Sequence, residues 1–125
     1  MPGYLAALDV YVQPSTHEGS PLAVLEAMSM GLPVVATPSA GCVELHDRCG
    51  LPQLVDATSA AELAQRLETL AGSSEQRTEL GAAARVAVER HFSPTTIVDQ
   101  YARMFEDVMH PAAVDAPTIA VQGGA

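Results

Sequence analysis

Residues 18–28 carry the clearest indication of chemistry in the sequence, because a glycine and a helix start lie between two glutamates. Ser20 is a favourable N-cap and Pro21 suits the first helical position, so we expect a helix from about residue 21 to residue 30. The first N–H groups of a helix have no intrahelical partner, and the helix dipole adds positive potential there. Gly19 would let a ligand approach the backbone closely. The segment therefore predicts an anion or polyol site at a helix N-terminus.

The two glutamates suggest hydroxyl groups as partners. Glu26 lies among apolar residues of the expected helix, so its carboxylate would need a partner if it were buried. A carboxylate can accept hydrogen bonds from two vicinal hydroxyls, as the acidic residue of the dinucleotide fingerprint does with a ribose. Glu18, close before the helix, would face the same space. Two ordinary alternatives remain: Glu18 could be a solvated loop residue, and Glu26 could point to solvent or pair with an arginine such as Arg48.

Short buried strands must position this segment. Residues 10–12 and 33–37 are apolar and rich in β-branched side chains, as buried parallel strands are, and residues 53–55 form a weak third candidate. Helices are expected at residues 3–8 and 42–47, and from Ser59, Ser73 and Ser93 onward, where serines precede helical patterns. This order predicts an α/β fold with a partial Rossmann-like parallel sheet and flanking helices. Three strands are few for such a sheet, so we expect its remainder before Met1.

Composition excludes several classes of function. The chain has 125 residues, a formal net charge of −9, six Lys+Arg residues and two cysteines. Such an acidic protein offers no electrostatic surface for nucleic acid or an anionic membrane. Cys42 and Cys49 fit no metal or redox spacing and indicate reduced thiols, hence a cytoplasmic protein. The histidines have no metal-ligand spacing, and no apolar run is long enough for a transmembrane segment.

The order of these features resembles the C-terminal domain of group 1, or family 4, glycosyltransferases. The resemblance rests on the segments Val12–Ser15, Glu18–Pro21, Glu26–Met28 and Gly31–Thr37, and on Gly41 and Glu44. Glu18 and Glu26 match the E-x7-E pattern of that family. The family has the GT-B architecture, in which two Rossmann-like domains face each other across a cleft. The resemblance covers residues 1–109, a partial nucleotide-sugar-binding domain, and leaves 110–125 as a tail expected to be disordered.

The resemblance implies a role for each matched residue. Glu18 would be the catalytic residue that faces the donor sugar near its reacting centre. Glu26 would hold the ribose hydroxyls. The donor-binding loop and helix start, which cradle the sugar and the diphosphate, would be formed by Gly19, Ser20, Pro21 and Leu22. The implied reaction is retaining transfer from a nucleotide-diphosphate sugar to an acceptor hydroxyl, without a metal or another cofactor.

One departure from the family limits this expectation. Family members carry an Arg and a Lys upstream that neutralise the diphosphate, whereas this chain has no lysine and its first arginine is Arg48. The acceptor-binding N-terminal domain is also missing from the match. We therefore expect the isolated chain to be inactive and to need that domain in cis or in trans. Two alternatives are a non-catalytic subunit that pairs with a separate acceptor-domain chain and a GT-B sugar-nucleotide epimerase, against which the glutamate spacing argues.

Overall fold

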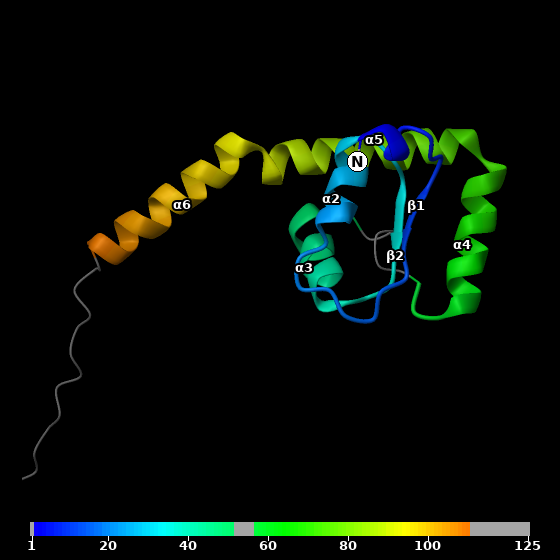
Figure 1. The fold of residues 1–125 in the computed structure, drawn as a ribbon, viewed down its shortest axis with the longest axis horizontal. Coiled ribbons are helices and arrows are strands. Elements are labelled where there is room, and N and C mark those ends of the chain that lie inside the picture. Colours follow the sequence, from blue (N-terminus) through cyan, green and yellow to red (C-terminus); the bar gives the residue numbers. More distant parts are fainter. Residues whose placement is uncertain (1, 52–56, 111–125) are drawn as a thin grey trace, which may run out of the picture. The chain divides into compact units, whose positions relative to one another are not determined.

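The computed structural model describes residues 2–51 and 57–110, which belong to two compact units, Met1–Ser93 and Pro94–Ala125. The described elements of the first unit are α1 (Pro2–Leu5), β1 (Tyr11–Gln13), α2 (Leu22–Ser29), β2 (Val34–Ala36), α3 (Ala40–Cys49), α4 (Ala60–Gly72) and α5 (Ser74–Phe92). The second unit contains α6 (Pro94–Met109). Figure 1 shows this order along the chain.

Strands β1 and β2 lie side by side and run parallel, with Tyr11 opposite Val34 and Gln13 opposite Ala36. Both strands fall within about one residue of their predicted positions. The α/β prediction with a parallel sheet is thereby confirmed. The third predicted strand, residues 53–55, lies outside the described residues. Because β1 and β2 are parallel, the loops that follow them emerge at the same edge of the sheet, where ligands bind in open α/β folds.

Strand β2 separates two layers of the apolar core. Val34 and Ala36 pack into a cluster that includes Met28 of α2, whereas Val35 packs with Leu70 of α4. Successive side chains of a strand point to opposite faces, so α2 and α4 cover opposite faces of the sheet. The ribbon in Figure 1 shows the strands between these two helices. An apolar strand that is buried on both faces was the reason to expect this layering.

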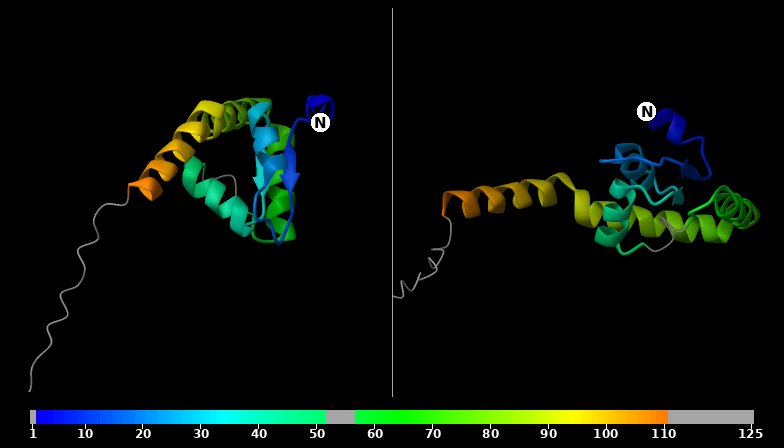
Figure 2. Two further views of the ribbon diagram at one scale, coloured as in Figure 1. Left: turned by 60° about the vertical axis from the view of Figure 1, so that its left-hand side comes forward. Right: turned by 90° about the horizontal axis from the view of Figure 1, so that it is seen from below.

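Helix α5 runs past both layers and joins them (Figures 1 and 2). Ala84 and Ala87 enter the core cluster of α2, and Leu80 packs against the cluster of α4. Gly81 comes so close to the turn after α2 that a Cβ there would lie 2.0 Å from the carbonyl oxygen of Gly31. Gly31 itself has a positive φ of 75°, which ends α2 in the left-handed region that glycine tolerates.

The predicted helix starts at Ser59 and Ser73 are confirmed. Ser59 and Glu62 form a reciprocal capping box, and the side chain of Ser73 accepts a hydrogen bond from the N–H of Gln76. Helix α3 covers the predicted 42–47 helix and is longer at both ends. Helix α1 is shorter than predicted, because the chain continues from Leu5 as hydrogen-bonded turns up to Leu8.

The close contact at Gly81 gives a stability prediction. Gly81→Ala should lower the free energy of unfolding by about 1–3 kcal/mol, since overpacking a tight contact costs that much. Gly72→Ala is the matched control, because a Cβ at Gly72, the last residue of α4, meets nothing within 4 Å. It should change stability by no more than about 0.5 kcal/mol. Urea denaturation of both variants measures the difference, and equal stabilities would show that α5 does not pack as described.

Candidate functional site

The loop between β1 and α2 approaches the helix differently from the prediction. Helix α2 begins at Leu22, its N-cap is Pro21 with φ −81° and ψ 67°, and no side chain caps it. The predicted N-cap role of Ser20 is therefore wrong. Pro21 is not in a helical conformation, so the helix starts one residue later and Ser20 stands too far back to cap it. A backbone group accepts these hydrogen bonds in place of a side chain: the Pro21 carbonyl accepts from the N–H groups of Val24 and Leu25 at 3.0 and 3.1 Å.

The N-terminal turn of α3 holds this loop from the other side. The N–H of Gly41 donates to the carbonyl oxygen of Glu18 at 2.7 Å. A Cβ at Gly41 would lie 2.8 Å from that same oxygen, 2.9 Å from the Gly19 carbonyl oxygen and 2.9 Å from the Pro21 ring. Only glycine allows the two backbones to approach this closely. The backbone around Glu18 is thus fixed by an element that begins more than 20 residues later.

The carboxylate of Glu18 is held by the end of β1. The side-chain amide of Gln13 donates from Nε2 to Glu18 Oε1 at 2.7 Å and to Ser15 Oγ at 2.8 Å. The phenol of Tyr11 donates to Gln13 Oε1 at 2.9 Å. Thr37, after β2, donates from its hydroxyl to the Ser15 carbonyl at 2.6 Å. Glu18 is partly buried in this network, so it is not the solvated loop residue of the first alternative.

Glu26 occupies a different environment. It lies on α2 and is exposed, with buried neighbours at Val24, Ala27 and Met28. The structure therefore supports the alternative in which Glu26 points to solvent, and its carboxylate does not need a partner because of burial. The helix turns its apolar residues inward at the 3.6-residue period, and position 26 falls on the outer face.

Both carboxylates nevertheless act on one group. Burial raises the pKa of Tyr11 above its ordinary value, and the negative charges of Glu18 and Glu26 and the nearby Cys42 raise it further. Carboxylates can accept hydrogen bonds from a polyhydroxylated ligand, and the carboxylate of Glu18 is held at the end of β1.

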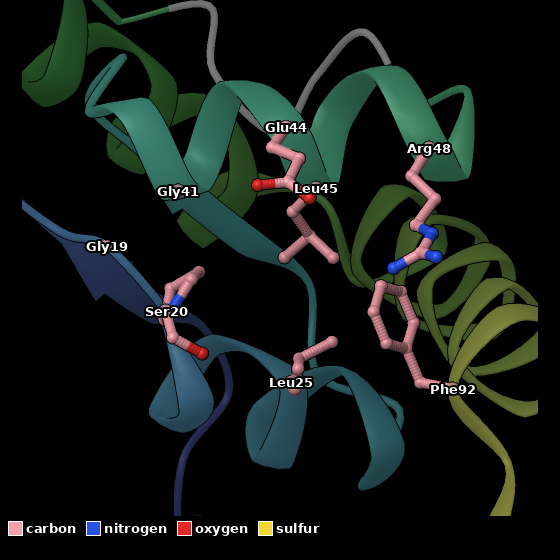
Figure 3. Close-up of a pocket in the computed structure, with 9 residues that line it drawn as sticks. Gly19, Ser20, Leu25, Gly41, Glu44, Leu45, Arg48 and Phe92 are labelled. Atoms are coloured by element: carbon pink, nitrogen blue, oxygen red, sulfur yellow. The ribbon is translucent and has the colours of Figure 1, made fainter. Parts of the chain in front are cut away.

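A cavity of about 150 Å³ lies beside the loop. It is lined by Gly19, Ser20, Pro21, Leu25, Gly41, Glu44, Leu45, Arg48 and Phe92, and Figure 3 shows how several of them face it. The Arg48 guanidinium stacks on the Phe92 ring, 5.1 Å from its centroid. The structure therefore brings a cation to the cavity that the loop backbone lines.

The predicted site residues divide between these two places. Gly19, Ser20 and Pro21 line the cavity with Arg48, whereas Glu18 and Glu26 are not among its lining residues. Leu22, predicted to contact the donor, is 66 % exposed and does not line the cavity either.

Three residues of the site were missed from the sequence. Gln13 and Tyr11 alternate along β1, which places both side chains on one face of the strand, and a polar residue at the end of a buried strand was an available signal. Arg48 follows Gly41 and Glu44 at helical spacing, so the three fall on one face of α3. No pattern along the chain shows which face of α3 meets the loop.

Comparison with known proteins identifies relatives of this chain. The family described as Glycosyl transferases group 1 matches residues 1–73. The D-inositol 3-phosphate glycosyltransferase of Pseudarthrobacter chlorophenolicus is 39% identical over 88 residues, which cover 69% of this chain and 20% of that protein. The lipopolysaccharide core biosynthesis glycosyltransferase LpsE of Rhizobium meliloti is 31% identical over 101 residues, 81% of this chain and 30% of that protein.

The name of a further relative includes a nucleotide sugar, UDP-Gal. The UDP-Gal:alpha-D-GlcNAc-diphosphoundecaprenol alpha-1,3-galactosyltransferase of Escherichia coli is 54% identical over 37 residues, which cover 30% of this chain and 10% of that protein. The chain thus spans between 10% and 30% of the length of these three relatives. No solved structure matches it.

The described residues contain neither a membrane-spanning helix nor a metal-binding cluster. No helix in residues 2–51 and 57–110 is long and apolar enough to cross a membrane. Within the same residues, no group of three or more His, Cys, Asp or Glu side chains could hold a metal ion.

The shared influence on Tyr11 can be tested by titration. Glu18→Gln and Glu26→Gln should each lower the pKa of Tyr11, because each removes a negative charge that disfavours the tyrosinate. The tyrosinate absorbance of a chain with Tyr4→Phe and Tyr101→Phe reports Tyr11 alone, since the sequence has three tyrosines.

Glu44→Gln is the control, because Glu44 is not among the charges that shift the pKa of Tyr11. The double variant at positions 18 and 26 should lower this pKa more than either single change. If Glu26→Gln leaves the pKa of Tyr11 unchanged, the two carboxylates do not share an influence on this phenol.

Proposed function

Because this chain belongs to the group 1 glycosyltransferases, we propose that residues 1–109 bind the nucleotide-diphosphate-sugar donor of a retaining glycosyltransferase. In this proposal Glu18 faces the sugar at its reacting centre, and Glu26 accepts hydrogen bonds from the ribose hydroxyls. The backbone of residues 19–22 cradles the sugar and the diphosphate. The acceptor is a hydroxyl group, and no metal or other cofactor takes part.

The observation that supports this proposal is the carboxylate of Glu18, which Gln13 holds by a hydrogen bond of 2.7 Å in the loop before α2. Glu18 and Glu26 differ in a way that suits two tasks. Glu18 is partly buried and hydrogen-bonded, so it can hold one position against a sugar. Glu26 is exposed, so it is accessible to hydroxyls at the outer side of the helix.

The phosphate groups of the donor require positive charge. The start of α2 supplies dipole potential, but the N–H groups of Leu22, Val24 and Leu25 already donate to carbonyls of the loop. Arg48 lines the cavity beside the same loop. A diphosphate leaving group needs more compensation than this, because charge develops on it during transfer. We propose that a further portion, in cis or in trans, supplies those cations and the acceptor site. The same portion would complete the site if this chain were a non-catalytic subunit.

Binding of nucleotides to the isolated chain tests the charge argument. UDP, GDP and ADP should bind with a Kd of about 1 mM or weaker, equivalent to about 4 kcal/mol. The net charge of −9 repels such ligands over the distance that salt does not screen. Calorimetric titration measures the affinity, and transfer by the isolated chain should be undetectable. Micromolar binding would show that the chain already contains the diphosphate site.

A chimera tests the assigned roles. The segment of the Pseudarthrobacter chlorophenolicus D-inositol 3-phosphate glycosyltransferase that matches this chain over 88 residues is replaced by the residues found here. Glu18→Ala should lower kcat about 100-fold or more with little change in donor KM, as removal of a group that acts at the reacting centre does. Glu26→Ala should raise donor KM about tenfold and leave kcat within a few fold.

Glu68→Ala, at an exposed position of α4, is the matched control and should change neither constant. Circular dichroism of each chimera establishes that it is folded. If a folded, active chimera tolerates Glu18→Ala, the catalytic role assigned to Glu18 is wrong. If Glu26→Ala changes kcat instead of KM, its place at the ribose is wrong.

A further inference from the structure

We propose that Gln13 is a positioning residue, which orients the Glu18 carboxylate toward the sugar of the donor. The inference rests on the proposed function, since it assigns to Gln13 the control of a group placed at the reacting centre. It adds a residue outside the loop and outside the E-x7-E pattern to the working site.

The orientation of the Gln13 amide is fixed by the hydrogen bonds of its oxygen and its nitrogen. The Tyr11 hydroxyl donates to Gln13 Oε1 at 2.9 Å, so the amide nitrogen points the other way. That nitrogen meets Glu18 Oε1 at 2.7 Å, a short distance typical of a hydrogen bond to a charged acceptor. A flipped amide would set oxygen against the carboxylate and leave the phenol without its acceptor. The phenol therefore selects the amide orientation in which Gln13 donates to Glu18.

Gln13 itself sits on a rigid element. It is the last residue of β1, paired with Ala36 of β2. Its carbonyl accepts from the Thr37 N–H at 3.1 Å and from the Thr37 hydroxyl at 3.3 Å. A hydrogen-bond donor at the end of a paired strand fixes the position of its acceptor more precisely than a hydrogen-bond donor on a loop would.

Glu18 is consequently held at two points. Gly41 fixes its backbone carbonyl, and Gln13 fixes Oε1 of its carboxylate. The bond from Gln13 uses one carboxylate oxygen, so Oε2 can accept from a hydroxyl of the sugar. A glutamate side chain loses rotamer freedom when it binds a ligand, and here the fold restricts that freedom before the ligand arrives.

The arrangement also indicates what Glu18 does. In the bond with Gln13 it is the acceptor, and a carboxylate has a second oxygen with which it can accept from a ligand. Glu18 would therefore bind a hydroxyl-bearing ligand and place a negative charge near the reacting carbon. This role demands a fixed carboxylate position, which is what Gln13 provides.

The experiment uses the isolated 125-residue chain and saturation-transfer NMR, which detects weak ligands. UDP-galactose, GDP-mannose and ADP-glucose are tested separately as probes. Saturation received by the sugar-ring protons is compared with that of the ribose protons of the same molecule. Gln13→Met removes the donor at similar side-chain length, and we expect the sugar-to-ribose ratio to fall by about half or more. A residue that only supports the fold would change both signals together.

Thr16→Ala is the loop control, because Thr16 is exposed and its hydroxyl contacts His17 and not the network. It should leave the ratio unchanged. Tyr11→Phe keeps Gln13 but frees its amide to rotate, so it should lower the ratio less than Gln13→Met does. This second variant keeps the test decisive if Gln13→Met does not fold.

A readout without any ligand distinguishes this inference from the proposed function. In the ¹⁵N-labelled chain, Glu18→Gln and Tyr11→Phe should each move the side-chain amide resonances of Gln13, and Thr16→Ala should not. Unmoved resonances, or an unchanged ratio in Gln13→Met, overturn the positioning role and leave sugar binding by the wild type unaffected. If the resonances move but none of the three probes receives saturation from the isolated chain or from the chimera described above, the donor proposal fails, and the inference that rests on it fails with it.

Discussion

The contact between the N-terminal turn of α3 and the loop before α2 constrains the backbone of residues 18–21 and the start of α2. Gly41 donates to the Glu18 carbonyl at 2.7 Å, and its missing Cβ leaves room for Gly19 and Pro21. The contact sets the path of residues 18–21, and through that path it sets where α2 can begin. The same loop lines the cavity with Arg48, and the carboxylate of Glu18 within it is hydrogen-bonded to Gln13 of β1. A side chain at position 41 would displace this loop.

The sequence predicted the elements better than it predicted the environment of single side chains. The strands near Tyr11 and Val34 and the helices after Ser59 and Ser73 follow from local patterns, namely β-branched runs and caps, which act over a few residues. Ser20 failed as an N-cap because the conformation of one residue, Pro21, decided the first turn. The sequence left the exposure of Glu26 open, since an apolar composition around position 26 does not reveal which face of α2 it occupies.

The parts of the site that escaped prediction are those formed by tertiary contacts. The bond from Gln13 to Glu18 spans five residues across a strand end and a loop, and its direction depends on a third residue, Tyr11. Arg48 reaches the cavity because α3 packs with one particular face toward Phe92 of α5, more than 40 residues later. Such arrangements require the docking of whole elements, and no local pattern encodes them. The matched family pattern located Glu18, but it carried no information on what holds its side chain.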